Sequence, residues 1–364
     1  MTKIKKIGID ARLYFQTGVG VYLRNLIHYL PKFSDPSSRY YIYVLKKDSS
    51  KIILPKGNFI LREVDSNWHS ITEQIKFYGT LMKDDLNLMH FTYFSYPVLY
   101  RRPFIATIHD ITPITFKTGR ASTLPKWAYS LKHNIYKFIL FQQIKNSMTI
   151  VVPTNAVKKN IIELYGANYS EKIKVIYEGV NHEFFEAKEN ISLKNKFPVP
   201  FFLYVGNFYP HKNVEKLIEA FKIANVQTPL VLAGPESYFS AKLKTLIDDK
   251  GIKNIYFFHP SKIEDMKFLY KNARALINPS LSEGFGLPLL EATYFGCPVI
   301  ASDLPVFHET LGDDFVSFDP NDVSDIAKKL QTNKLKSATN LSQFSFEKMT
   351  KEIVDIYNDH TRHL

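Results

Sequence analysis

Two glutamates, Glu283 and Glu291, bracket a glycine-rich stretch whose sequence is E-G-F-G-L-P-L-L-E. The short apolar run at 275–277 that precedes it is typical of a buried parallel strand. Pro288 suits the start of a helix, because the first helical N–H has no partner within the helix and proline lacks that N–H. The stretch therefore predicts a strand, a turn that carries Glu283, and a short helix that carries Glu291.

The predicted turn and helix start have the properties of an anion site. Backbone N–H groups beside the positive end of a helix dipole bind phosphate well. Carboxylates do not favour phosphate, so we expect Glu283 and Glu291 to bind hydroxyl groups instead. A ligand with hydroxyl groups at both ends and phosphates between them is a nucleotide-sugar. The residues predicted to contact it between the two carboxylates are Gly284, Phe285, Gly286 and Leu287.

This stretch resembles the E-x₇-E motif of the retaining glycosyltransferases of family four, which have the GT-B fold. The resemblance implies an α/β protein in which two Rossmann-like domains, each a doubly wound parallel sheet, face each other across a cleft. It implies that Glu283 contacts hydroxyls of the donor sugar and that Glu291 contacts the ribose. The implied activity is retaining transfer of a hexose from a nucleotide-diphosphate sugar, of the GDP-mannose or UDP-glucose type, to a glycan or lipid-linked acceptor in polysaccharide or lipopolysaccharide synthesis.

A second glycine turn, G-N-F-Y-P-H-K-N from Gly206, follows the strand predicted at 201–205 and carries Lys212. Lysine supplies a point charge and the turn supplies N–H groups, which together suit a phosphate. The resemblance implies that Lys212 neutralises the donor diphosphate. Asn207 and His211 stand where many relatives have arginine, so diphosphate binding depends either on Lys212 and backbone amides alone or on another basic residue. Further donor contacts are implied for Gly234 and, where the family cradles the nucleobase, for Phe257.

The N-terminal half offers further candidates at the ends of predicted strands. Gly18 and Gly20 lie between a strand and a helix, where glycine lets the backbone approach a ligand closely. His109 follows the apolar run at 104–108, at the edge where open α/β sheets bind ligands. The resemblance implies that this glycine turn faces the donor phosphates and the acceptor, and that His109 lies near the transferred sugar. Glu178 replaces the family's usual asparagine.

Apolar runs and amphipathic stretches alternate along the chain, which favours doubly wound parallel sheets. The 364 residues suggest about two domains. We expect an acceptor-binding domain over residues 1–185, a nucleotide-sugar-binding domain over 186–345, and a terminal helix over 346–364 that crosses back to the first domain. The charged segment 182–200 is interpreted as the linker.

The net charge of +12 comes from one half of the chain. Residues 1–190 hold 27 Lys and Arg against 15 Asp and Glu, and residues 191–364 hold 20 of each; the excess peaks at 101–150, with 8 against 1. A helix predicted at 124–146 interleaves aromatic residues such as Trp127 and Tyr129 with lysines, which suits a membrane surface or a core helix whose lysines reach water. We expect a cytoplasmic protein with peripheral contact to anionic membrane on its inner face.

Other features limit the chemistry. The single cysteine, Cys297, excludes an intrachain disulfide framework. The N-terminus enters a strand pattern at once, so we expect no signal peptide, and no apolar run approaches the ~20 residues of a membrane span. No D-x-D motif, the usual carboxylate pair for a metal-bridged diphosphate, occurs. We therefore expect no metal or other cofactor and assign charge neutralisation to Lys212 with helix dipoles and loop amides.

Three alternatives stay open from the sequence. A GT-B-fold sugar-nucleotide epimerase or phosphorylase would share the fold, although no segment declares the lysine that binds pyridoxal phosphate in a phosphorylase. The replacements at Asn207, His211 and Glu178 suggest a non-catalytic nucleotide-sugar-binding subunit. The basic half suggests a nucleic-acid-binding protein, but no recognition-helix, zinc or single-strand-binding motif supports it, so we expect no nucleic-acid partner.

Overall fold

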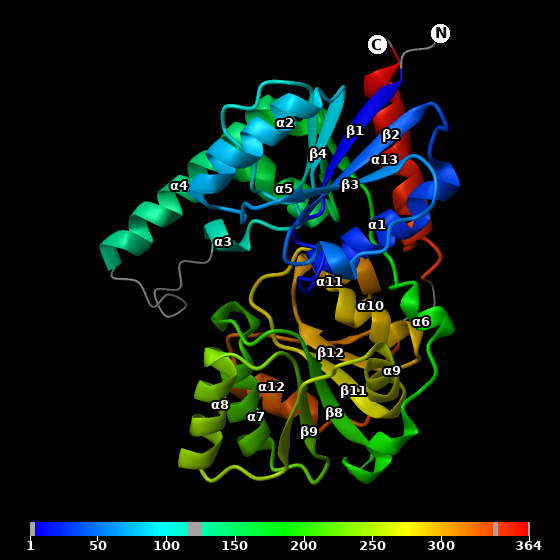
Figure 1. Ribbon diagram of the computed structural model, residues 1–364. Helices are drawn as coiled ribbons and strands as arrows, with labels where there is room; N and C mark the ends of the chain where they lie inside the picture. The colour runs from blue at the N-terminus through cyan, green and yellow to red at the C-terminus, as the bar shows by residue number, and fades with distance from the viewer. Residues whose placement is uncertain (1–3, 116–125, 198, 338–340, 363–364) are drawn as a thin grey trace. The chain divides into compact units, whose positions relative to one another are not determined.

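Short apolar strands alternate with helices along the chain and form two separate parallel sheets (Figure 1). The computed structural model describes residues 4–115, 126–197, 199–337 and 341–362. Within these ranges, one compact unit comprises residues 4–115, 126–179 and 344–362, and the other comprises residues 180–343. The chain passes from the first unit to the second between Gly179 and Val180, whereas the sequence predicted a boundary after residue 185.

The first unit is built on a parallel sheet. Its strands are β1 (Lys5–Asp10), β2 (Ser38–Leu45), β3 (Phe59–Val64), β4 (Leu88–Phe91), β5 (Phe104–Thr107), β6 (Ile150–Val152) and β7 (Ile173–Val175). They lie in the order β3-β2-β1-β4-β5-β6-β7, so the order reverses between β1 and β4, as in doubly wound folds. Both β4 and β5 are buried along their whole length, as expected of strands covered on two faces.

Helices cover both faces of this sheet. They are α1 (Val19–Phe33), the π-helical turn η2 (Glu73–Phe77), α2 (Tyr78–Asp84), α3 (Thr112–Thr115), α4 (Lys126–Asn146), α5 (Asn155–Tyr165) and α13 (Phe346–Thr361), with short 3₁₀ turns at η1 (Ser49–Lys51) and η4 (Ala167–Lys172). Phe77, Leu81 and Ile139 share one core cluster, which puts η2, α2 and α4 on the same face. Figure 1 shows α2 and α4 together on one side of the sheet and α13 on the other.

The C-terminal helix α13 is held in the first unit at both ends. Near its start, a Cβ at Gly179 would lie 2.4 Å from the backbone nitrogen of Phe346, so a residue with a side chain would force the two segments apart. The side chain of Ser345 caps the helix by accepting from the N–H of Lys348. Further along, the hydroxyl of buried Tyr357 lies 2.6 Å from Nδ1 of His90 in β4. The C-terminal segment therefore completes the core of the first unit.

The buried His90 should make the first unit sensitive to acid. Burial, with a smaller effect of nearby His109, lowers the pKa of His90 to about 3, whereas an unfolded histidine titrates near pH ~6.5. Between these values only the unfolded chain binds the proton, so the free energy of unfolding falls as the pH decreases from about 6.5 towards 3. Chemical denaturation would measure the free energy of unfolding at pH 7 and at pH 5. Between these pH values, the free energy of unfolding of His90→Gln should fall by about 2 kcal/mol less than that of the wild type. Equal losses would contradict this.

The second unit is also built on a parallel sheet. Its strands are β8 (Phe201–Val205), β9 (Leu230–Ala233), β10 (Ile255–Phe258), β11 (Ala273–Asn278), β12 (Val299–Ser302) and β13 (Val316–Phe318), in the order β10-β9-β8-β11-β12-β13. The helices are α6 (Glu183–Glu186), α7 (Val214–Ala224), α8 (Tyr238–Asp249), α9 (Ile263–Asn272), α10 (Leu287–Tyr294), α11 (Pro305–Leu311) and α12 (Val323–Leu330), with 3₁₀ turns η5 (Ile191–Asn195) and η6 (Pro210–Lys212).

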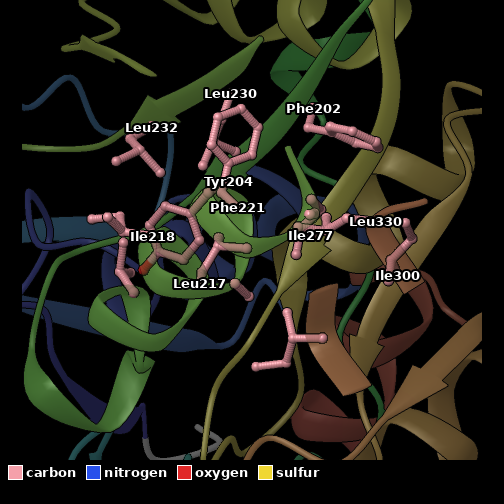
Figure 2. Packing of buried hydrophobic residues seen from close by; sticks show 14 of the residues in the cluster. Phe202, Tyr204, Leu217, Ile218, Phe221, Leu230, Leu232, Ile277, Ile300 and Leu330 are labelled. Carbon is pink, nitrogen blue, oxygen red and sulfur yellow. The ribbon is translucent and has the colours of Figure 1, made fainter. Parts of the chain in front are cut away.

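One face of this sheet packs against α7 and α12 in a single apolar cluster. Figure 2 shows Leu217, Ile218 and Phe221 of α7 beside Tyr204 of β8 and Leu232 of β9. This packing fixes the start of α7 relative to the end of β8. The loop between them, which carries the predicted phosphate-binding lysine, is therefore held at a rigid edge.

The segment 182–200 is not an open linker. It contains α6 and η5, and Phe184 and Leu193 are buried. Nζ of Lys267 in α9 donates to the carbonyls of Phe184 at 3.2 Å and Ala187 at 2.8 Å. The linker interpretation was wrong, because a few buried apolar side chains decide where this charged segment packs.

Candidate functional site

Two predicted donor residues follow neighbouring strands of the second sheet. Lys212 lies in η6, after β8, and Glu283 lies in the loop after β11. Strands β8 and β11 are adjacent, and the strand order reverses between them. In open α/β sheets ligands bind at the carboxyl ends of the strands at such a reversal. The fold therefore brings Lys212 and Glu283 to the edge where this class of sheet binds ligands.

The two side chains form an ion pair. Nζ of Lys212 lies 2.7 Å from Oε1 of Glu283, and the hydroxyl of Ser280 donates to the same oxygen at 2.7 Å. The backbone holds the two loops together as well, because the N–H of Leu281 donates to the carbonyl of His211 at 2.8 Å. Both side chains keep a small exposed fraction, 18% for Lys212 and 13% for Glu283. The pair is thus preformed and still reachable from solvent.

The pair fixes the charge of Glu283. Burial would raise the pKa of Glu283, but the attraction and hydrogen bond of Lys212, the hydrogen bond of Ser280 and nearby His211 outweigh it, so the pKa lies below its usual value. The carboxylate is therefore ionised at neutral pH. An ionised carboxylate accepts hydrogen bonds from hydroxyl groups and does not donate, as a ligand to sugar hydroxyls requires.

The turn after β8 is packed tightly against the turn after β9. A Cβ at Gly234 would lie 2.0 Å from the carbonyl oxygen of Gly206 and 2.9 Å from the ring of Phe208, so residue 234 must be glycine. The hydroxyl of Tyr204 donates to the carbonyl of Asn207. Oδ1 of Asn207 accepts from the N–H of Tyr209 at 3.3 Å, so this side chain supports its own turn. The structure thus brings Gly206, Asn207 and Gly234 together at the ends of β8 and β9.

The glycine loop after β11 leads directly into α10. Gly286 has a φ of +92°, a conformation that favours glycine, and α10 begins at the next residue with a proline in its first turn. Glu291 is buried on this helix, where the hydroxyl of Tyr270 donates to its Oε2 at 2.8 Å. Tyr270, which the sequence analysis did not identify, therefore orients the second carboxylate of the motif. The loop residues Gly284 and Phe285 are also buried.

A small open pocket lies at the carboxyl ends of β9 and β10. Its volume is about 50 Å³, and Gly234 and Phe257, both predicted donor residues, line it. Phe208, Lys244 and His259 line it too. Phe208 and Lys244 were missed by the sequence analysis, because a phenylalanine in a turn and a lysine on the helix after a glycine turn resemble many others. Nζ of Lys244 lies 5.4 Å from the centre of the Phe257 ring, so a cation and an aromatic face adjoin in this pocket.

The N-terminal glycines of the first unit differ from each other. Gly18 has a φ of +67° with no atom near its Cβ position, and it caps the start of α1. A Cβ at Gly20 would lie 2.6 Å from the carbonyl oxygen of Tyr14, so this glycine lets the loop after β1 pack on the helix. The guanidinium of Arg24 donates to the same carbonyl at 2.9 Å. Gly18 thus borders open space, whereas Gly20 has a packing role.

His109 is held by two acceptors within the first unit. Its Nδ1 lies 3.0 Å from Oε1 of Glu178, and its Nε2 lies 3.1 Å from the carbonyl oxygen of Thr92. A carboxylate and a carbonyl both accept, so the two hydrogen bonds form together only when both ring nitrogens carry hydrogen. The ring of Tyr22 packs edge-on at 4.8 Å. Glu178, which departs from the family's asparagine, therefore serves to hold this histidine.

The side chains of Trp127 and Tyr129, which the sequence analysis considered for membrane contact, lie outside those that the structure describes. Among the residues that the structure describes, no group of three or more His, Cys, Asp or Glu side chains is arranged to hold a metal ion. None of the described helices combines the length and apolarity that a membrane span requires.

Comparisons with known proteins agree with this architecture. A family model described as Glycosyltransferase Family 4 matches residues 17–184, and one described as Glycosyl transferases group 1 matches residues 185–342. The chain is 30% identical over 261 residues to the O-antigen chain mannosyltransferase RfbU of Salmonella typhimurium, covering 71% of this chain and 66% of that protein. It is 33% identical over 171 residues to the O-antigen chain mannosyltransferase B of Escherichia coli, covering 43% of this chain and 45% of that protein.

These matched stretches span two thirds or less of the relatives' own length. Among solved structures, Anabaena HepE in complex with UDP and glucose is similar with a TM-score of 0.72 at 16% sequence identity, over 98% of this chain and 100% of that one. At this identity the likeness concerns the fold alone. The two family models together span most of the chain, and with its two parallel-sheet units they show that it belongs to family 4 of the glycosyltransferases, which have the GT-B fold.

Proposed function

We propose that this protein is a retaining glycosyltransferase that moves a hexose from a nucleotide-diphosphate sugar to a glycan or lipid-linked acceptor during lipopolysaccharide or other surface-polysaccharide synthesis. The observation that carries the proposal is the ion pair between Lys212 and Glu283, where the strand order of the second sheet reverses. The names of the relatives, both O-antigen mannosyltransferases, support a mannosyl donor such as GDP-mannose. The UDP and glucose complex of HepE supports a nucleotide-sugar as the ligand class.

In this proposal the donor binds between Lys212 and Glu283 and breaks their ion pair. The diphosphate binds the ammonium group of Lys212, and hydroxyls of the sugar donate hydrogen bonds to the carboxylate of Glu283. Because the two groups lie 2.7 Å apart, one ligand with phosphate and hydroxyl groups on adjoining atoms can reach both. Positive charge on Lys212 stabilises the leaving nucleotide diphosphate as the glycosidic bond breaks. Glu283 orients the sugar for transfer.

The remaining donor contacts follow the loops that border this pair. The loop from Gly284 to Leu287 opens α10 and directs backbone N–H groups and the positive end of its dipole towards the ligand edge. Glu291, oriented by Tyr270, is proposed to bind the ribose, and the pocket at Phe257 and Lys244 is proposed to take the nucleobase. In the first unit, the turn that carries Gly18 and Gly20 is proposed to face the donor phosphates and the acceptor.

His109 is proposed to take part in transfer from the first unit. Since both of its ring nitrogens are engaged, its position depends on Glu178 and Thr92. We expect His109→Ala to lower kcat about tenfold, an effect typical of losing one hydrogen bond to a charged group. Glu178→Gln keeps a hydrogen-bonding side chain beside Nδ1 and should have a smaller effect than Glu178→Ala. Steady-state kinetics with saturating donor would measure this; full activity of both Ala variants would remove the histidine from the mechanism.

Transfer is proposed to proceed without a divalent metal, because Lys212 and the helix and loop amides supply the positive charge. We expect a chelator to leave the initial rate unchanged to within about twofold. The control is the same assay after dialysis against chelator and re-addition of Mg²⁺ or Mn²⁺. A loss of activity that added metal restores would overturn this part of the proposal.

The protein is further proposed to act at the inner face of the cell membrane, through peripheral contact of the basic first unit with anionic lipid. A lipid-linked acceptor would be met at that surface. The excess of Lys and Arg in residues 1–190 supports this, because anionic headgroups attract basic segments.

Product analysis tests the proposed function. The purified protein would first be screened by thermal shift against UDP-, GDP-, ADP- and dTDP-hexoses, since a ligand of the native state raises the melting midpoint. The donor found would then be incubated with short glycan acceptors, and NMR would determine the anomeric configuration of the product. The proposal expects an acceptor-linked hexose with the donor's configuration. Nucleotide diphosphate released without an acceptor-linked sugar would favour the epimerase, and binding without turnover on any acceptor would favour the non-catalytic subunit.

A further inference from the structure

Helix α4 carries apolar side chains on an exposed side. Leu131 is 56% exposed, Ile135 47%, Phe138 52% and Phe141 36%. Their spacing puts them on one side of a helix. The opposite side of α4 is also apolar and is buried in the first unit through Ile139, Leu140 and Ile144. The core therefore accounts for one apolar side of α4 and leaves the other in contact with water.

A second exposed apolar row lies on the helical segment 71–84, which contains η2 and α2. Ile71 is 79% exposed, Ile75 67% and Met82 36%. The inward side chains of this segment, Phe77 and Leu81, share a core cluster with Ile139 of α4. Both rows therefore lie on the outer side of the same helical layer, and Figure 1 shows α2 and α4 on one side of the sheet. We call Ile71, Ile75, Leu131, Ile135, Phe138 and Phe141 the docking face.

The charge around the docking face is positive. Helix α4 contains four lysines and no Asp or Glu, and Lys132 and Lys145 are exposed. Lys76 and Lys83 are exposed on the second segment. The exposed acids nearby already have basic partners, because Asp65 lies 3.7 Å from Lys76 and Asp85 pairs with Arg102. Lys83, Lys132 and Lys145 therefore leave an excess of positive charge beside the exposed apolar side chains of the face.

We infer that the docking face rests on an anionic lipid bilayer, with its apolar side chains entering the headgroup region and its lysines facing lipid phosphates. Exposed apolar side chains flanked by lysines are what an interfacial helix presents to anionic lipid. A second copy of the chain is a poorer occupant, because like lysines would meet across the contact. The inference rests on the proposed function in one respect, because a lipid-linked acceptor gives the protein a reason to bind the bilayer. Beyond the proposed function, the inference identifies the surface that touches the lipid.

Vesicle sedimentation tests this surface. The full chain would be mixed with vesicles of phosphatidylcholine containing about one third phosphatidylglycerol, and with phosphatidylcholine alone, at low and high salt. The test variant is Ile135→Glu/Phe138→Glu. The matched control is Ile53→Glu/Ile223→Glu, which changes two exposed isoleucines, one in each unit, that lie outside the docking face. Circular dichroism and thermal shift with the donor confirm that all three proteins fold and bind donor alike.

We expect the wild type and the control to bind the anionic vesicles at low salt, to release at high salt as screening increases, and to bind neutral vesicles weakly. The test variant should partition at least about tenfold less. Equal binding by the test variant, or no binding by the wild type, would overturn the inference. The inference would also be overturned if the wild type and the control formed a concentration-dependent dimer in sedimentation and the test variant did not. A second copy of the chain would then cover the docking face. Failure of all three proteins to bind any nucleotide-sugar would instead remove the proposed function and leave the vesicle result standing.

Discussion

Replacing Lys212 with alanine should lower kcat/KM by about 100- to 1,000-fold, the range seen when one charge-stabilising donor is removed from a transition state. The loss should appear in both donor affinity and kcat, because the ammonium group contacts the diphosphate before and during departure. The substitution also leaves Glu283 without its partner beside the phosphate site. The remaining carboxylate would then repel the diphosphate, which adds to the loss.

Lys216→Ala is the matched control for this variant. Lys216 lies on α7, shortly after Lys212, and its Nζ donates to the carbonyl of Asn321 in an exposed position. We expect the kcat/KM of Lys216→Ala to stay within about twofold of the wild-type value, since exposed lysine contacts contribute little. A Lys212→Ala variant that transfers sugar at a rate close to the wild type would show that the diphosphate is neutralised elsewhere.

Glu283→Gln should separate nucleotide binding from transfer. Glutamine keeps the size of the side chain and can still accept from the hydroxyl of Ser280, but it removes the charge that binds Lys212. The freed ammonium group should hold a nucleoside diphosphate as well as before or more tightly. Turnover should fall about 100-fold, because the sugar loses charge-assisted hydrogen bonds that orient it.

Calorimetry with the nucleoside diphosphate and kinetics with the intact donor measure the two effects separately. Glu215→Gln, which changes an exposed carboxylate in the first turn of α7, is the control and should alter neither. The assignment of Glu283 to the sugar would be wrong if Glu283→Gln lost nucleotide affinity in the same proportion as turnover. That outcome would show that the carboxylate of Glu283 acts mainly by holding the loop after β11 in place through Ser280 and Lys212.

The local patterns of the chain predicted most of this architecture. Apolar runs located the strands that were expected at 104–108, 201–205 and 275–277, and glycine turns located loops at the carboxyl ends of strands. The motif around Glu283 predicted a helix at Pro288, and α10 begins beside it. These features depend on neighbours in sequence, so the sequence alone was sufficient. The GT-B fold predicted from the resemblance is confirmed by the two parallel sheets and the family matches.

Contacts between distant residues could not be predicted in the same way. Lys212 and Glu283 were each assigned to the donor, but their direct ion pair depends on β8 and β11 being neighbours in the sheet. The hydrogen bond from the hydroxyl of Tyr270 to Glu291 depends on how α9 packs on α10. The contact between Glu178 and His109 depends on β5 and β7 ending at the same edge of the sheet, on either side of β6. The sequence showed only that Glu178 departs from the family's asparagine.

The central claim is that Lys212 and Glu283, at the ligand edge of the second sheet, together bind the diphosphate and the sugar of one activated hexose. Calorimetric titration of the wild type and of Lys212→Ala with UDP-, GDP-, ADP- and dTDP-linked hexoses tests it most directly. We predict saturable heat with at least one of these donors for the wild type and an affinity at least about tenfold lower for Lys212→Ala. No binding of any donor by the wild type, or equal binding by both proteins, would contradict the claim.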